Sequence, residues 1–213
     1  MAIAFDAITN ASYGGSGGTS KTYAHTVTGS QPLLFENVHT DSNVVTGVTY
    51  AGVAMTKIFG QATDFYNTVW ALVNPATGAN NIVISCSSSV NIIPMTISYT
   101  GCAQSLPTAF NTGSGAGSPL GVAVTTLVDN SWVMGFSRIT VASGISAGTG
   151  TTSRAIDSTY AFATVDSGGA VTPAGSKTLN LVHSGTAYMG VVAFAPYVAA
   201  GSQNSNMFFS RGR

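Results

Sequence analysis

Charged side chains are scarce in this sequence. Seven Lys and Arg balance seven Asp and Glu, so only 7% of the 213 residues are charged and the formal net charge is zero, whereas about 25% charged residues is usual for a soluble domain. Without a basic excess there is no electrostatic attraction for nucleic acid or for an acidic membrane surface, and we expect neither as a partner. The polar surface must therefore be built from Ser, Thr, Asn and Gly.

Long apolar runs are also missing. No segment has the length and uninterrupted apolarity of a transmembrane helix. The first ten residues, MAIAFDAITN, contain no basic residue and include Asp6, which is unlike a secretory signal peptide. We therefore expect the chain to be made in the cytoplasm. Its content of 45% hydrophobic residues excludes a disordered chain.

Only two cysteines occur, Cys86 and Cys102. The segments around them predict two strands joined in a hairpin near residue 89, with Cys86 beside the turn. Cys102 would then lie ten residues further along, roughly 33 Å away at about 3.3 Å per residue. A disulfide joins Cα atoms less than about 7 Å apart, so we expect two free thiols, as in a reducing compartment.

Helical periodicity is almost absent, and strand patterns recur every 8 to 15 residues instead. Apolar residues alternate in several of them, and the last, AYMGVVAFAPY, is apolar on both faces, as in a central strand. Short strands separated by Gly, Asn and Ser turns are typical of a sandwich or barrel. We predict an all-β, antiparallel, two-sheet jelly-roll-like sandwich that forms a single domain over residues 1–198. The predicted strands are 21–27, 32–39, 44–59 (bent at Ala51-Gly52), 65–73, 80–88, 91–100, 119–127, 131–141, 154–165, 176–184 and 187–197.

A glycine-rich stretch, SYGGSGGTSKTY at residues 12–23, matches two active-site loops at once. Gly14 to Gly18 fits G-x-S-x-G, the nucleophile elbow, but that motif needs a helix after the serine. Residues 18–22 nearly fit the end of a phosphate-binding P-loop, which also opens a helix. Because a strand pattern follows Gly18, we interpret the stretch as a loop between the first two strands.

No catalytic set or cofactor site is indicated. His25, His39 and His183 lie in or at the ends of predicted strands, and a site built from Glu36, His39 and Asp41 is disfavoured because residues 36 and 39 point to opposite faces of a strand. The seven carboxylates are scattered along the sequence. Their positions indicate neither the pair of facing carboxylates that a glycosidase needs nor an acidic loop that would bind calcium. We therefore expect no catalytic residue, no metal and no cofactor. Six aromatic residues fit either the core or a sugar-binding platform, and both remain open: Tyr66, Trp70, Tyr99, Trp132, Tyr160 and Tyr188.

Residues 199–213, AAGSQNSNMFFSRGR, differ from the rest of the chain. Residues 199–206 read as a linker of small and polar residues, and an apolar group with a cationic tip follows it. A frayed end is the alternative, but three large apolar side chains would then lie in water. We interpret residues 199–213 as a linker and docking arm that binds a groove on a neighbouring subunit or particle protein. The docking residues are Met207, Phe208, Phe209, Arg211 and Arg213.

Several phrases together resemble a jelly-roll, concanavalin-like domain that recurs in bacteriophage virion proteins and in some secreted bacterial proteins. The resemblance spans roughly Phe5 to Pro196, and its motifs are structural, so it transfers no site residue. Secreted relatives would be expected to carry a signal peptide and further domains, and because this sequence shows neither, we expect it to be closer to the bacteriophage proteins. The phrases are TYAHTVTGSQPLLFENV, VTGVTYAGVAMTKI, WALVNPATGANNIVIS, MTISYTGCAQS, SWVMGFSRI and AGSKTLNLVHSGTAYMGVVAFAP.

The resemblance implies a structural virion protein, made in the host cytoplasm, that acts as a capsid decoration or minor capsid protein. Few lysines to protect sheet edges and a near-zero net charge also favour assembly. The expected partners are other copies of the chain, in a homo-oligomer such as a trimer, and other virion proteins. The alternative is a carbohydrate-binding adhesion module of a tail or fibre that binds a host glycan, and a hydrolase on the same fold ranks third.

Overall fold

The computed structural model describes residues 1–11, 17–60 and 66–199. Every regular element in these residues is a β-strand, and the sheets are antiparallel and packed as in a sandwich, which confirms the predicted all-β class. Among the same residues there is no helix with the length and apolarity needed to cross a membrane.

Residues 4–100 form two sheets. The first inner sheet has the strand order β1-β9-β3-β7-β6, and the first outer sheet has the order β2-β8-β4-β5. The inner strands are β1 (Ala4–Asn10), β3 (Leu33–Thr40), β6 (Thr56–Gly60), β7 (Asn67–Val73) and β9 (Ile92–Thr100). The outer strands are β2 (Gly18–Val27), β4 (Val45–Tyr50), β5 (Val53–Ala54) and β8 (Gly78–Val90).

Residues 109–194 form two more sheets. The second inner sheet has the order β10-β17-β12-β15-β14, and the second outer sheet has the order β11-β16-β13. The inner strands are β10 (Ala109–Gly115), β12 (Trp132–Ile139), β14 (Thr152–Asp157), β15 (Phe162–Asp166) and β17 (Ala187–Phe194). The outer strands are β11 (Leu120–Thr125), β13 (Ser146–Ala147) and β16 (Ser176–Val182).

The two halves repeat one topology. If β10 is matched with β1 and β17 with β9, and the short β5 is omitted, both sheets of the second half have the same strand order as those of the first. The prediction of two sheets is therefore wrong, because the structure has four sheets, built as two sandwiches of one design. Periodicity within single strands did not reveal this, since it does not show which strands share a sheet. The prediction of one domain over residues 1–198 stays a prediction.

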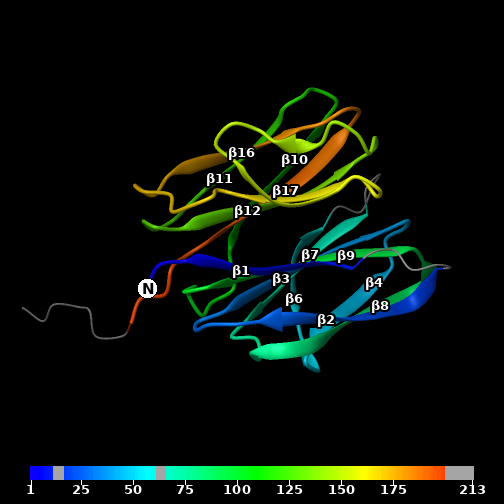
Figure 1. The fold of residues 1–213 in the computed structure, drawn as a ribbon, viewed down its shortest axis with the longest axis horizontal. Coiled ribbons are helices and arrows are strands. Elements are labelled where there is room, and N and C mark those ends of the chain that lie inside the picture. The colour runs from blue at the N-terminus through cyan, green and yellow to red at the C-terminus, as the bar shows by residue number, and fades with distance from the viewer. Residues whose placement is uncertain (12–16, 61–65, 200–213) are drawn as a thin grey trace, which may run out of the picture.

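The four sheets stack as layers, with the two inner sheets facing one another (Figure 1). One core lies between the inner sheets and includes Phe35, Tyr99, Phe136 and Phe194. A further core lies between the inner and outer sheet of each half. Strands β3, β9 and β17 are consequently buried on both faces along almost their whole length, as the apolar run at residues 187–197 predicted.

Polar and aromatic contacts join the halves at both margins of the inner sheets. Near β1 and β14, Asn10 Nδ2 donates to Asp157 at 2.9 Å, and the Arg154 guanidinium lies 4.6 Å from the Phe5 ring centre. At the opposite margin Phe59 of β6 stacks on Phe110 of β10 at 5.5 Å. In the repeat, β1 corresponds to β10 and β6 corresponds to β14. The contacts join β1 to β14 and β6 to β10, so each strand contacts the counterpart of the other, as in a two-fold arrangement of the halves.

The strand assignment differs from the sequence prediction in several places. The segment predicted as one bent strand at 44–59 is divided into β4 and β5 of the outer sheet and β6 of the inner sheet, and the short strand β13 was not predicted. The segment predicted as one strand at 154–165 is a hairpin of β14 and β15, and β1 and β10 were not predicted. Strands β8 and β9 do not form a hairpin, because β8 pairs with β2 and β4 whereas β9 pairs with β1 and β3. The two thiols are free, but the reason is different from the one expected: Cys86 and Cys102 lie in separate cores.

Candidate functional site

The glycine-rich loop provides no catalytic turn in the part that the structure describes. Residues 12–16, which include most of the G-x-S-x-G match, lie outside the described residues. Strand β2 begins at Gly18 and pairs with β8. A strand rather than a helix therefore follows the motif, as the sequence pattern predicted, and neither the elbow nor the P-loop has its required context.

An aspartate, a serine and a histidine meet between the two sheets of the first half. The Ser98 hydroxyl donates to Asp6 Oδ2 at 2.7 Å, and His25 Nε2 lies 3.1 Å from Ser98 Oγ. Because the serine proton is given to Asp6, the imidazole must donate from Nε2. In a catalytic triad the histidine accepts the serine proton and the aspartate orients the histidine. This cluster has the opposite polarity. His25 and Ser98 are buried and Asp6 is partly buried, and the contact of His25 on β2 with Ser98 on β9 joins the two sheets.

A second buried cluster surrounds Glu36 of β3, which has no exposed surface. The Thr96 hydroxyl donates to Glu36 Oε2 at 2.5 Å, and the Tyr23 hydroxyl lies 2.8 Å from Thr96 Oγ1. Burial raises the pKa of the Glu36 carboxyl to about 8, although the hydrogen bond from Thr96 opposes this rise. A neutral carboxyl group in a closed space between sheets has no route to a substrate, so it serves the fold.

The other candidate ligands are dispersed. The site imagined from Glu36, His39 and Asp41 does not form a cluster, and no group of three His, Cys, Asp or Glu side chains within the described ranges could hold a metal ion. The His39 ring packs on Phe162 at 5.2 Å, and His183 Nε2 lies 3.1 Å from the Gly117 carbonyl oxygen.

The aromatic residues that left a sugar-binding platform open are mostly in the core. Trp70, Tyr99, Trp132 and Tyr188 are buried, and Tyr66 and Tyr160 are partly buried. Of the large aromatic side chains that the structure describes, only Phe110 is classed as exposed, at 49%. A stacking platform for sugar rings therefore has no support in this part of the chain.

On the two outer sheets, no charged side chain of the described residues is classed as exposed. On β2 and β8 of the first outer sheet, exposed positions that alternate with the core residues Val27, Ile82 and Ile84 are small or polar, whereas Val53 of the edge strand β5 is an exposed apolar residue. The small or polar residues are Ser20, Thr22, Ala24, Thr26, Asn81 and Ser85. On the second they are Gly121, Thr125, Ser176 and Thr178. Lys21 and Lys177 lie on these strands, yet their ammonium groups donate to the backbone carbonyls of Ile92 and Gly150.

Across the described residues only three charged side chains are classed as exposed, namely Asp41, Lys57 and Asp129. The others are buried or partly buried, and Asp166 is an example: it pairs with Arg154 at 2.5 Å and accepts from the Tyr99 hydroxyl at 3.0 Å. The scarcity of charge in the sequence is thus more extreme on the surface than in the composition.

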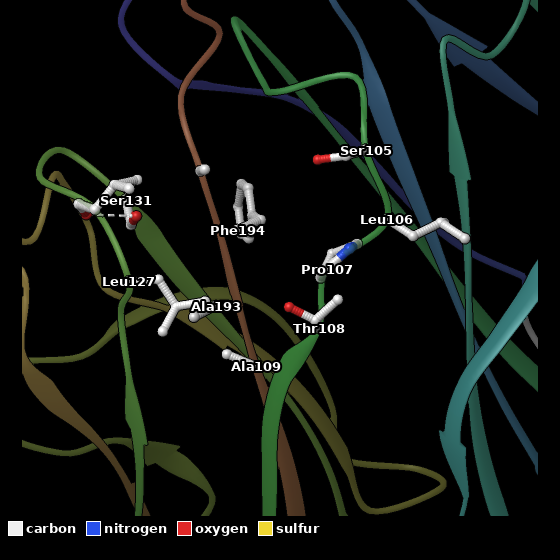
Figure 2. Close-up of a pocket in the computed structure, with 11 residues that line it drawn as sticks. Ser105, Leu106, Pro107, Thr108, Ala109, Leu127, Ser131, Ala193 and Phe194 are labelled. Atoms are coloured by element: carbon white, nitrogen blue, oxygen red, sulfur yellow. Dashed lines mark hydrogen bonds between the residues drawn. The ribbon is translucent and has the colours of Figure 1, made fainter.

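A groove opens at one rim of the second half, and we name it the rim groove (Figure 2). Residues 105–109 form one wall, Leu127, Val128 and Ser131 form the other, and residues 193–195 of the β17 end form the floor. It encloses about 200 Å³. The Ser131 hydroxyl is already bonded to the Val128 carbonyl at 2.7 Å, so it offers its acceptor side only.

Exposed apolar side chains continue from the rim groove along the molecule. Leu127 is 70% exposed and Val128 47% exposed. A neighbouring hollow shares Thr108, Ala109 and Leu127 with the groove and extends to Phe110. Exposed apolar side chains beside a groove can mark a protein-binding surface, so this rim is the candidate docking site among the described residues.

The docking residues expected from the sequence, Met207, Phe208, Phe209, Arg211 and Arg213, lie outside the described residues. The rim groove was not foreseen, because its walls come from two loops and a strand end far apart in the sequence. Comparisons with protein-family models, with curated proteins and with solved structures give no match to this chain.

Proposed function

We propose that this protein is a structural subunit of a bacteriophage virion, a capsid decoration or minor capsid protein that acts through protein–protein assembly. The observation that carries the proposal is the surface: three exposed charged side chains among the described residues, two outer sheets on which none of these three lies, and an apolar rim. A near-neutral surface favours association over mutual repulsion. The sequence resembles domains of virion proteins, and for this reason we propose that the assembly takes place on a virus particle.

Sheet edges support the same proposal. Strands β2 and β5 are the edges of the first outer sheet, and β11 and β13 are those of the second. Monomeric β proteins protect such edges with charge, proline, bulges or very short edge strands, and β2 has a register shift between Gly18 and Ser20 while β5 and β13 have two residues each. The edge that carries this argument is therefore β11. Here the lysine of β2 donates to a backbone carbonyl, and β11 contains no charged residue. Edges of this kind are suited to neighbours in a homo-oligomer, for which a trimer is one closed form, or in a particle lattice.

The carbohydrate-binding adhesion module is the competing function, and the buried aromatic residues give it no support. The experiment described below therefore distinguishes this adhesion function from the assembly function. In an assembly subunit, particle binding should be stoichiometric and nearly independent of salt, because exposed charges that could be screened are few.

The experiment is to purify particles of the phage that encodes the chain and to measure the ratio of this protein to the major capsid protein by quantitative mass spectrometry. A fixed ratio that persists from about 50 mM to about 500 mM salt is expected. Absence from particles, together with retention on a glycan array that free sugar competes away, would replace the assembly function by the adhesion function.

A further inference from the structure

We propose that the rim groove is the receptor for the arm, residues 199–213, of a second copy of this chain, with Met207, Phe208 and Phe209 as the apolar group that enters it. The inference rests on the proposed function as an assembly subunit and names the contact by which copies join. It requires that the groove can accept apolar side chains, that the arm can reach it, and that its charges match.

The groove meets the first requirement. Its walls and floor present Leu106, Pro107, Leu127, Val128 and Phe194, and Leu127 and Val128 are exposed. Figure 2 shows Leu127 and Phe194 between the loop that carries Ser105 to Thr108 and the loop that carries Ser131. Covering this surface with Met and Phe side chains removes apolar area from water on both partners.

The position of the last described residue meets the second requirement. Ala199 lines a hollow that also contains Asn130 and Trp132, and these residues directly follow the groove wall formed by Leu127 and Val128. The arm of each copy therefore leaves from the same rim that carries its groove. The seven residues from 200 to 206 span at most about 25 Å, so two copies that meet rim to rim place each apolar group within reach of the other groove.

The path of the chain after β17 favours the groove of a second copy over the chain's own. Beyond the groove floor, Ala195 accepts from the Ala103 amide and the Tyr197 amide donates to Gly101, at 2.8 Å in both cases. The amino group of Met1 donates to the Tyr197 carbonyl at 3.0 Å. The chain is thereby held along residues 101–103 and the first residue, past the groove, and would have to reverse to enter it. An exchange between two copies is symmetric, as in a closed dimer or ring.

Charge at the rim meets the third requirement. Asp129 follows Val128 directly, is exposed, and uses one carboxylate oxygen to accept from the Ala174 amide at 2.7 Å. It is one of the two exposed carboxylates in the described residues, the other being Asp41. Arg211 and Arg213 follow the apolar group of the arm. An arm seated in the groove brings these arginines to the only part of the rim loop that carries negative charge.

The test uses the full chain. A photoreactive benzoyl-phenylalanine replaces Phe208, the protein is mixed with an equal amount of ¹⁵N-labelled wild-type chain, and the mixture is irradiated and digested. Cross-linked peptides should join the arm to residues 105–109 or 127–131. Because an unlabelled arm can meet a groove of either population, the cross-links that join an unlabelled arm to a labelled groove are the ones that show contact between copies. Cross-links confined to one label would place the arm in its own groove, and cross-links elsewhere would remove the groove as receptor; either result overturns the inference.

Self-association of full-length variants gives an independent measurement. Leu127→Ser combined with Val128→Ser should weaken self-association in sedimentation velocity by about tenfold or more, whereas Asp129→Asn should weaken it by less than about fivefold. Val53→Ser, a change at a 55% exposed valine of the first half, is the matched control and should have no effect. Equal weakening by the control and the groove variants would contradict the proposal.

The two proposals fail separately. If the protein is absent from particles but mixed-label cross-links to the groove form, the virion function is wrong and the groove assignment stands. If the protein is stoichiometric in particles but the arm does not cross-link to the groove, the virion function stands and the contact lies elsewhere, for example on the faces of the outer sheets.

Discussion

Glu36 is an acid that the fold keeps neutral. It lies on β3 between two sheets, has no exposed surface, and accepts from Thr96. Burial raises the pKa of its carboxyl group to about 8, compared with about 4.3 in an unfolded chain. Between these two values the folded chain holds a proton that the unfolded chain has lost. The free energy of unfolding must then fall as pH rises, by at most about 1.4 kcal/mol per pH unit.

Replacement of Glu36 by Gln should remove this fall, because the amide keeps the shape of the neutral carboxyl group and does not titrate. Urea unfolding of both proteins at intervals from pH 6.5 to pH 8 measures it. We expect the wild-type midpoint to decrease over this range and the Glu36→Gln midpoint to stay nearly level. A variant with the same slope as the wild type would show that another group is responsible.

His25 should produce the opposite trend on the acid side. Burial lowers the pKa of its imidazole to about 4, although nearby Asp6 opposes the change, whereas the pKa is about 6.5 in an unfolded chain. Between pH 4 and 6.5 the unfolded chain binds a proton that the folded chain lacks, so stability rises with pH. The effects of His25 and Glu36 oppose each other from about pH 4.5 to 6.5, and wild-type stability should be nearly level there. In His25→Gln the same unfolding measurement should reveal a stability that falls across that window.

At the scale of the strand, Gly190 of β17 shows how closely the inner sheets approach. A methyl group at this position would lie 2.1 Å from Cε2 of Phe59, a ring that is itself buried and stacked on Phe110. Gly190→Ala should therefore lower the free energy of unfolding by about 1–3 kcal/mol through overpacking. Gly47→Ala in β4 is the control, because nothing lies within 4 Å of its added methyl group. Calorimetry should show a lower melting temperature only for the first variant.

Most strands could be predicted from the sequence, and their partners could not. Alternation at Ile82, Ile84 and Cys86 identified β8 correctly because one face is buried and the other is wet. The segment AFNTGSG of β10 has no such alternation, so it was missed. Pairing depends on contacts between distant segments, and the expected hairpin of β8 and β9 was wrong because the chain changes sheets between them.

The candidate site was even less accessible to sequence reasoning. The seven carboxylates were treated as scattered residues that form no site, and their burial was not predicted, yet Glu36, Asp157 and Asp166 are buried. Their burial contributes to a surface on which only three charged side chains of the described residues are exposed, and the composition alone did not indicate this. The rim groove joins residues near 107, 128 and 194, and no local pattern connects three segments so far apart. Only the arm could be predicted from a local sequence pattern, namely an apolar group that follows a linker of small and polar residues.

At the scale of the whole molecule, the repeated strand order makes one chain equivalent to a fused pair of sandwiches. The two halves share one strand order but carry different polar groups. Glu36 and His25 lie in the first half, whereas the Arg154–Asp166 pair and the rim groove lie in the second or at its junction with the first. Asp166 is enclosed in the core between the inner sheets, where it contacts Tyr99, whereas Glu36 and His25 are enclosed between the inner and outer sheets of the first half.

The closeness of Met1 to Tyr197 has a consequence for chain connectivity. Because the first residue contacts the end of the second sandwich, the order of the halves along the chain should be exchangeable. A circular permutant that starts at Ser105, runs to Ala199, continues through a short Gly-Ser joint into Met1 and finishes at Gln104 should fold. New ends are tolerated where few elements are interrupted, and this break falls between β9 and β10. We expect circular dichroism to show the same strand content, with melting within a few degrees of a parent chain that ends at Ala199. An unfolded permutant would mean that the order of synthesis, and not only the final contacts, is required to bring the two sandwiches together.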